Sequence, residues 1–449
     1  MISKDKLKKQ FELEIKHFEE THKKSKALYI EARESLLQGV PLNWMVRWMG
    51  NFPISVVDAK GVHVTCADGH DYIDFCLGDT GSLVGHAPQA AAKAINDQFA
   101  KGASFMLPTA DAAWNGRELQ SRFGMKYWQF ATSATDANRF ALRLARQVTG
   151  RSKIIVFNWC YHGTVDETIA SMAPDGKTIA RKGNLGQPVD PEVTTKVIEW
   201  NDIDALEAAL KDRDVAAVLA EPVMTNIGVV LPKPGFHDAM RELTIKYDTP
   251  LIIDETHTMC AGVGGYTKDH GLKPDMITCG KFLASGIPAG AYGFTEEFGK
   301  KATAVIEEQY GVAKGIGGTL AANALTMAAM RATLGEILTQ DFYARNIPLA
   351  KKFNEGVQKS IDEFDLPWST TQLGCRTEYV FSREIPKNGT DAYLAKDQDL
   401  DWYMHLASLN RGIIMTPFHN MALITNATTL ADIDRHTEVF REIISNIAE

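Results

Sequence analysis

Residues 251–260, LIIDETHTMC, join three branched apolar side chains directly to two carboxylates. The apolar run at 251–253 follows a proline and has the length and composition of a buried strand in a parallel sheet. Asp254 and Glu255 then stand at the carboxyl end of that strand, where open α/β sheets bind their ligands. Two interpretations are open for these acids: they mark the exit of the chain to solvent, or they hold a ligand.

Similar short apolar runs recur on both sides of this stretch. They are KIIVF (153–157), AAVLA (216–220) and DMITCGK (275–281), and helical patterns of 10–20 residues separate them. Strands that alternate with helices predict βαβ units, so we expect an α/β domain with a mostly parallel sheet flanked by helices.

The two ends of the chain have a different pattern. Residues 3–38 have apolar side chains at helical spacing and predict one long amphipathic helix, and residues 53–76 alternate like a small antiparallel meander. The tail from about 330 combines helices with the runs at 378–382 and 412–416. We therefore expect a large domain over 76–329 and a smaller α+β domain built from segments 1–75 and 330–449.

Size and composition exclude several classes of protein. The 449 residues are enough for two domains, and a formal net charge of -8 argues against a broad nucleic-acid surface. The charged N-terminus has no signal-peptide pattern, and no run is long enough to span a membrane. The six cysteines are scattered without zinc-site spacing, so we expect a cytoplasmic protein without a metal site.

The segment FATSATDANRFALRLAR (130–146) is a strand end, a turn of small residues and a helix. Ser133 and Asp136 have the spacing of a capping box, which by itself indicates only a helix start. However, free N–H groups at a helix N-terminus, together with the hydroxyls of Ser133 and Thr135, also suit a phosphate.

Two further strand ends and one lysine complete the pattern. Tyr161 and His162 follow the run at 153–157, Glu221 follows the run at 216–220, and Lys281 ends the run at 275–281 before a glycine-rich loop. An aromatic side chain at such an edge either stacks on a planar ligand or packs in the loop, and the lysine is either solvated or a Schiff-base former. Together, a Schiff-base lysine, an acid for a pyridinium nitrogen, a stacking ring and a phosphate site are what pyridoxal 5′-phosphate (PLP) requires.

The order of these motifs resembles the class III PLP-dependent aminotransferases of fold type I, most closely the glutamate-1-semialdehyde aminomutase branch. The resemblance covers roughly residues 40–445, and it rests on six motifs. They are TSATDA (132–137), YHG (161–163), EPVMTNIGVVLPKPGFHDAMREL (221–243), the pair Asp254-Glu255, PDMITCGK (274–281) and the pair Gly318-Thr319. Fold type I implies a seven-stranded, mostly parallel sheet in the large domain.

The resemblance assigns roles to individual residues. It implies that Lys281 forms the Schiff base and moves the α-proton, and that Asp254 pairs with the pyridine nitrogen. The remaining cofactor-binding residues that it implies are Ser133, Ala134, Thr135, Tyr161, His162, Glu221, Thr256 and Thr319, the last acting across the interface of a homodimer with shared active sites.

Some positions depart from the family pattern. Ala134 and Asp136 replace the usual Gly and Glu, and Thr256-His257 puts polar side chains where the family usually has a Val under the ring. The polar pair Thr256-His257 either bears on the reaction rather than on the cofactor, or it is neutral drift around an unchanged cofactor.

The substrate is expected to be a small anionic amine or amino acid. A guanidinium binds a carboxylate or phosphonate with a fork of donors, and Arg47 in NWMVRWMGNFP (43–53) is the first candidate, with Trp44 as a wall. Arg376 is the second. Because Lys281 and Asp254 serve several reactions, an aminotransferase ranks first as the commonest case, and an ammonia-lyase or an aminomutase remains the alternative.

Overall fold

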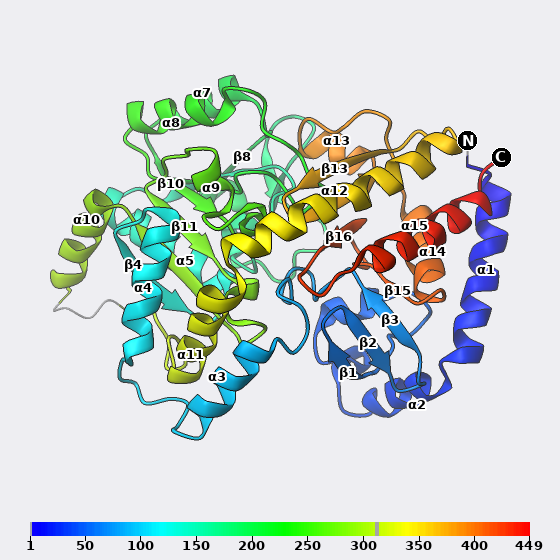
Figure 1. Ribbon diagram of the computed structural model, residues 1–449. Coiled ribbons are helices and arrows are strands. Elements are labelled where there is room, and N and C mark those ends of the chain that lie inside the picture. Colours follow the sequence, from blue (N-terminus) through cyan, green and yellow to red (C-terminus); the bar gives the residue numbers. More distant parts are fainter. Residues whose placement is uncertain (1, 310–313) are drawn as a thin grey trace. The chain divides into compact units, whose positions relative to one another are not determined.

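The computed structural model describes residues 2–309 and 314–449 (Figure 1). Contacts within the chain group it into two compact units. Unit 1 comprises Met1–Pro88, Ala344–Ile385 and Ala395–Glu449, and unit 2 comprises Gln89–Tyr343 and Pro386–Leu394. The units therefore change over at 88 and 343 rather than near 75 and 329, and a nine-residue piece of the C-terminal part belongs with unit 2.

Unit 2 is built on a seven-stranded sheet with the order β4-β12-β11-β10-β9-β5-β8. Only β12 runs antiparallel to its neighbours. The expected mostly parallel sheet is therefore confirmed. Its strands are β4 (Tyr127–Ala131), β5 (Lys153–Phe157), β8 (Thr195–Ile198), β9 (Val215–Ala220), β10 (Leu251–Asp254), β11 (Met276–Cys279) and β12 (Gly290–Phe294).

Helices flank this sheet (Figure 1). The helix α5 (Ala134–Thr149) begins at the N-cap Ser133, ends at the left-handed Gly150, and packs on β12, β11 and β9 through its apolar face. The other helices of unit 2 are α3 (Gln89–Phe99), α4 (Ala110–Phe123), α6 (Pro191–Thr194), α7 (Ile203–Leu210), α8 (Phe236–Lys246), α9 (Gly265–Asp269), α10 (Glu296–Glu307), α11 (Ala324–Ala332) and α13 (Gly389–Leu394).

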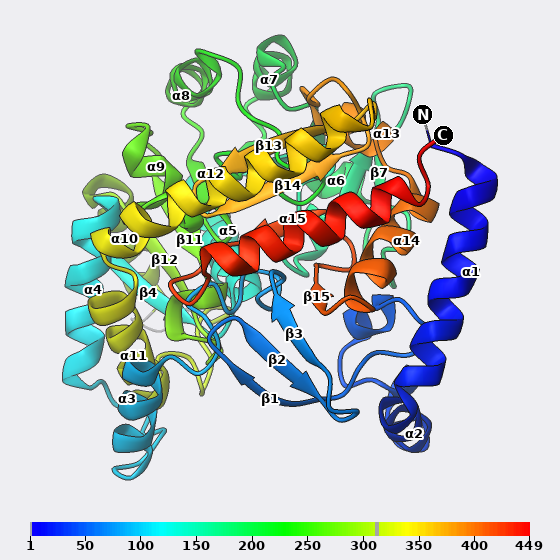
Figure 2. The same cartoon turned by 45° about the vertical axis from the view of Figure 1, so that its right-hand side comes forward.

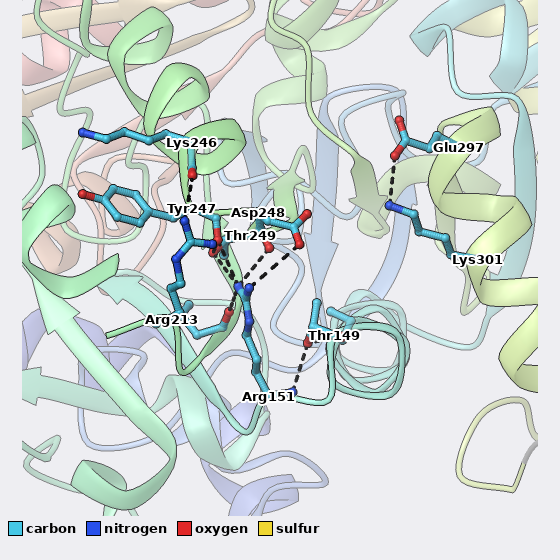
Figure 3. A network of polar contacts seen from close by, with 11 residues as sticks. Thr149, Arg151, Arg213, Lys246, Tyr247, Asp248, Thr249, Glu297 and Lys301 are labelled. Carbon is cyan, nitrogen blue, oxygen red and sulfur yellow. Dashed lines mark hydrogen bonds and ion pairs between the residues drawn. The ribbon is translucent and has the colours of Figure 1, made fainter. Parts of the chain in front are cut away.

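Arg151 binds the segment that leads into β10 (Figure 3). Its Nη1 donates to the carbonyl oxygens of Tyr247 at 3.2 Å and Asp248 at 2.9 Å, and to Thr249 Oγ1 at 3.1 Å. It also reaches Val215 O at the start of β9. One guanidinium thus links the start of β9 with the segment before β10, and the parallel pairing of the two strands, Ile252 with Leu219, sets their register.

Unit 1 contains two small sheets and a set of helices (Figure 2). One sheet has the order β1-β2-β3-β15 and contains the expected antiparallel meander; the other has the order β13-β14-β16. The strands are β1 (Val56–Lys60), β2 (His63–Cys66), β3 (Asp71–Asp74), β13 (Ser369–Leu373), β14 (Arg376–Val380), β15 (Ile413–Ile414) and β16 (Met421–Leu423). The main helices are α1 (Lys4–Thr21), α2 (Lys23–Ala32), α12 (Gln340–Glu363), α14 (Gln398–Leu409) and α15 (Leu430–Ser445).

The predicted single helix over 3–38 is in fact two helices. The break is at His22, which has φ -116° and ψ 47°. Its buried imidazole is 2.9 Å from Phe18 O and 2.7 Å from Tyr72 Oη. This contact with β3 takes the backbone out of the helical conformation, which the local periodicity could not indicate. Within the described residues, no helix is long and apolar enough to cross a membrane.

Candidate active site

The site is centred on Asp254, the last residue of β10. Its carboxylate is buried and accepts three hydrogen bonds. Oδ2 accepts from Asn138 Nδ2 at 2.8 Å and from His162 Nδ1 at 2.9 Å, and Oδ1 accepts from the backbone N–H of Thr256 at 3.0 Å. Burial by itself raises the pKa of Asp254, but these donors, His162 first, bring it below the ordinary value. Asp254 is therefore an ionised carboxylate in a buried position.

His162 is the cationic partner of this carboxylate. Its side chain is fully buried. Burial lowers the pKa of His162. The neighbouring Cys160 and the Asp254 carboxylate outweigh this effect and raise the pKa to about 10. The imidazolium and the carboxylate thus form a buried ion pair, in which removal of one partner leaves the other charge uncompensated.

Asn138 is a part of the site that the sequence analysis missed. It lies on α5, donates a second hydrogen bond to His162 O at 3.2 Å, and accepts one from Thr278 Oγ1 at 2.5 Å. The contact with Thr278 orients the amide so that its nitrogen faces Asp254. An asparagine among the apolar residues of a helix face was the available signal, and its partner 116 residues away was not visible in the sequence.

Glu255 has a different use from Asp254. Its buried carboxylate accepts from Thr258 Oγ1 at 2.5 Å, Thr267 N at 2.5 Å and Tyr266 N at 3.2 Å. Burial raises the pKa of Glu255. Because the turn after β10 and the start of α9 occupy both oxygens, Asp254 remains the acid available to a ligand at the sheet edge.

The predicted phosphate turn begins α5. Ser133 Oγ accepts from Asp136 N at 3.1 Å, which confirms Ser133 as the N-cap. The Asp136 carboxylate accepts from the hydroxyls of Thr132 and Ser133. The N-terminus of a sixteen-residue helix with hydroxyl side chains is a suitable anion site.

Glycines bring the phosphate turn against the other two loops. A Cβ on Gly280 would lie 2.8 Å from Ala134 Cβ, and one on Gly163 would lie 2.1 Å from Thr135 Oγ1. Thr135 Oγ1 also accepts from Thr164 N at 3.1 Å. The turn at 133–135 is therefore in direct contact with the residue before Lys281 and with the loop of His162.

Lys281 begins a short 3-10 turn, Lys281–Ala284, and is half-buried. Its φ of 53° lies in the left-handed region, which is uncommon and costly for a side chain of this size. The lysine, the turn at 133–135 and the buried Asp254 together form a donor set that fits an aromatic nitrogen heterocycle with an aldehyde and a phosphate.

The remaining predicted residues of unit 2 lie either in loops that follow strands of the sheet or in an exposed segment. Tyr161 is half-buried in the loop of His162, and Glu221 is buried at the end of β9, where its Oε2 accepts from Thr225 N at 3.1 Å. Thr256 is buried beside Asp254. Thr319 lies in an exposed segment of unit 2, so the prediction that it acts on a partner subunit remains a prediction.

The two predicted substrate arginines have different surroundings within unit 1. The guanidinium carbon of Arg47 lies 5.5 Å from the Trp44 ring and 5.2 Å from the Phe418 ring, and Arg47 makes no ion pair or hydrogen bond with any described residue. Arg376 is fully buried, and its Nη2 lies 2.7 Å from Glu378 Oε2. Burial raises the pKa of Glu378. Arg376 and His419 outweigh this effect and lower the pKa to about 2. Arg47 therefore has its donors available for an anion, whereas Arg376 already pairs with one.

Comparison with known proteins identifies the family. The model of the class-III aminotransferases matches residues 44–447. The chain belongs to this family. It is a PLP-dependent enzyme of fold type I.

Three relatives illustrate the similarity. A glutamate-1-semialdehyde 2,1-aminomutase of Aquifex aeolicus is 32% identical over 94% of this chain and 100% of its own length. A crystal structure of a glutamate-1-semialdehyde aminomutase from Pseudomonas aeruginosa PAO1 in complex with PMP is 45% identical, covers 99% of both chains and has a TM-score of 0.97. An omega-transaminase from Sphaerobacter thermophilus is 25% identical over 95% of this chain and 98% of its own, with a TM-score of 0.87.

Proposed function

We propose that this enzyme moves the amino group between neighbouring carbons of one small anionic amino compound, as an aminomutase does. The observation that carries the proposal is the similarity to glutamate-1-semialdehyde aminomutases along almost the whole chain. From the sequence alone, transfer to a separate keto acid ranks first because that reaction is the commonest in the family. The relatives favour a reaction within one molecule.

Within this proposal each residue has a chemical task. Bound PLP supplies an electron sink for negative charge at the carbon that carries the amino group. Lys281 would hold the aldehyde end of the cofactor and move a proton on and off the substrate carbon. Asp254, kept ionised by His162, would hold the ring nitrogen protonated, and the turn at 133–135 would hold the phosphate.

Arg47 would bind the anionic group of the substrate. Its guanidinium is stacked by Trp44 and Phe418, so its orientation is limited while its N–H donors stay available. A planar guanidinium binds a carboxylate or a phosphonate with two parallel hydrogen bonds. This supports a substrate with an acid group at one end and an amino group at the other.

A second candidate is an ammonia-lyase acting on a β-hydroxy or β-substituted amine. The observation that favours it is Thr256, which places a buried hydroxyl next to Asp254 where the family usually has a valine. A hydroxyl in that position can bind a polar leaving group. The two candidates differ in whether nitrogen leaves the molecule.

The test is a single-turnover experiment on the PLP-loaded protein. Glutamate-1-semialdehyde, small amino acids and aminophosphonates are added without any keto acid, and visible absorbance, free ammonia and products are measured. A product isomeric with the substrate and no ammonia supports the amino shift. Continued release of ammonia indicates the lyase, one equivalent of a keto product with lasting loss of the cofactor's visible band indicates a transaminase, and either result overturns the proposal. Lys281→Ala should be inactive with every substrate.

The proposal includes a homodimer in the cytoplasm in which Thr319 completes the phosphate site of the partner subunit. Exposed apolar side chains of unit 2 support an interface: they include Phe99, Met106, Leu107 and Leu320, the last next to Thr319. Light scattering of the protein and the cofactor affinity of Thr319→Ala test this. A monomeric protein, or a variant with unchanged affinity, contradicts the shared site.

A further inference from the structure

The segment Pro386–Leu394, here called the strap, has an unusual place in the chain. The residues on both sides of it belong to unit 1, but the strap itself belongs to unit 2. It contains the short helix α13 and leads into the N-cap of α14 at Asp397. Its contacts with unit 2 centre on the loop that carries His162.

The first contact involves the start of α13. The strap lies so close to Asn158 that a Cβ on Gly389 would be 2.1 Å from Asn158 O. Thr390 Oγ1 donates to Glu199 Oε1, and Asn158 Nδ2 donates to the same oxygen at 2.7 Å and to Thr390 Oγ1 at 3.2 Å. Asn158, at the end of β5, is thus fixed from the strap by a three-membered network.

The second contact is aromatic. The rings of Tyr393 and Trp159 are parallel within 10°, and their centroids are 4.0 Å apart. Trp159 has a φ of 67° in the left-handed region, and its carbonyl oxygen accepts from Asn226 Nδ2 at 3.0 Å. A strained backbone conformation persists only where its surroundings enforce it, and here the surroundings include the strap.

Both contacts lie next to the cofactor site. Asn158 and Trp159 precede Tyr161 and His162 by two to four residues, and the position of His162 decides whether its Nδ1 reaches Asp254 at 2.9 Å. A short loop fixed at its first two residues has few conformations left for the next three.

We propose that the strap is a positioning element for PLP, and that Thr390 and Tyr393 are positioning residues that hold the loop 158–163 in its cofactor-binding conformation. They act through Asn158 and Trp159 on His162, and through His162 on the charge of Asp254. The proposal concerns cofactor binding alone. It therefore stands or fails independently of which amino-group reaction the enzyme carries out.

A merely structural role makes a different prediction. If the strap only ties down the chain between Ile385 and Ala395, its variants should exchange amide hydrogens faster within 386–394 and leave the loop 158–163 as it was. If the strap positions the loop, exchange should rise at 158–163, in protein without cofactor as well.

The experiment uses the full-length chain with Thr390→Ala and Tyr393→Ala, their conservative counterparts Thr390→Ser and Tyr393→Phe, and Trp402→Ala as a matched control. The ring centroids of Trp402 and Phe11, both in unit 1, are 6.3 Å apart. This control therefore also removes a partly exposed aromatic stack, but not one on the loop 158–163. The measurements are the dissociation constant of PLP from a titration of cofactor-free protein, amide exchange of the peptide 158–163, and thermal unfolding.

The two alanine variants should bind PLP up to about tenfold more weakly, the scale of one lost hydrogen bond or ring stack. They should also expose the amides of 158–163, whereas Thr390→Ser, Tyr393→Phe and Trp402→Ala bind PLP like the unaltered protein. Unchanged PLP affinity and unchanged exchange at 158–163 in folded alanine variants would overturn the proposal. If an alanine variant does not fold, the same comparison is made with Thr390→Val, which keeps the shape and removes the hydroxyl.

Discussion

Replacing His162 by phenylalanine is the most direct test of how the protein keeps Asp254 ionised. His162→Phe keeps a planar ring in a fully buried position and removes the Nδ1–H that lies 2.9 Å from Asp254 Oδ2. Asn138 and the backbone N–H of Thr256 remain as donors to the carboxylate. The substitution therefore removes the positive charge and leaves the two neutral hydrogen bonds.

The magnitude follows from the kind of bond that is lost. A hydrogen bond to a charged group contributes about 1.5–3 kcal/mol, which corresponds to a factor of roughly 10–150 in a binding constant. Asp254 must carry its charge to pair with a protonated ring nitrogen, so we expect this loss in the affinity for PLP. The pKa of Asp254 should rise, and the loss of affinity should therefore be larger at pH 6 than at pH 8.

The ion pair also predicts how stability depends on pH. The pKa of His162 is raised to about 10 in the folded protein, against an ordinary value near 6.5. A raised pKa means that the stabilisation by this group is complete below pH 6.5 and is lost as the pH rises through about 10. The difference in unfolding free energy between the unaltered protein and His162→Phe should therefore be full at pH 6 and smaller at pH 9.5.

The assay combines PLP titrations from pH 6 to 9 with urea unfolding at pH 6 and 9.5. His270→Phe is the matched control. The imidazole of His270 is exposed and stacks on the Tyr266 ring, with 3.6 Å between the ring centroids, and its replacement should not affect cofactor binding. If His162→Phe bound PLP as tightly as the control at every pH, the carboxylate would not depend on the imidazolium, and the account of Asp254 given above would be refuted.

Three further predictions concern the substrate, the phosphate turn and the core of unit 1. Arg47→Gln should raise the KM for the anionic substrate roughly 10–100-fold and leave PLP affinity unchanged, with Arg47→Lys in between because it lacks the planar fork; a loss confined to kcat would contradict this. Gly280→Ala places a Cβ 2.8 Å from Ala134 Cβ, so PLP titration should show weaker binding, and unchanged affinity would mean that the contact relaxes freely. His436 is buried, and burial lowers its pKa to about 3. As the pH falls from 6.5 to 3, the unfolded chain takes up a proton that the folded protein does not, so the free energy of unfolding should fall by up to about 1.4 kcal/mol per pH unit. In urea unfolding at pH 7, 5 and 4, His436→Phe should lack this slope, and parallel curves for the two proteins would show that His436 is not its source.

The sequence predicted β5, β9, β10 and β11 of the large sheet because their side chains are almost all buried, whereas it did not predict β8, and it placed β12 in a glycine-rich loop. The run KIIVF at 153–157 coincides with β5, and the apolar run before Asp254 lies within β10. Strands that are buried on both faces are continuous apolar runs, so they can be recognised from their composition without knowledge of a distant partner. The break at His22 shows the opposite case, since a single contact with Tyr72 ended a helix whose local pattern continues.

The candidate site was predictable to the extent that each residue has a fixed place in a motif. Lys281 and Asp254 stand at strand ends, and the helix start at Ser133 follows from its neighbours. Asn138 could not be predicted, because its task is set by a carboxylate 116 residues away. Likewise, nothing in the sequence distinguishes Arg376, which is paired with Glu378, from Arg47, which is not.

Asp254, the last residue of β10, and Glu255, the residue after it, show that a cationic partner decides the direction in which the pKa of a buried acid moves. Burial acts on both carboxylates in the same direction and raises the pKa of each. Among the described residues, Glu255 receives only neutral donors, two backbone N–H groups and a hydroxyl, and its pKa stays raised. Asp254 receives as many hydrogen bonds, but one comes from the buried imidazolium of His162, and its pKa is lowered. Because the two sites match in burial and in number of donors, the charge of His162 is what keeps Asp254 ionised, and only an ionised carboxylate can hold the proton on a pyridine nitrogen.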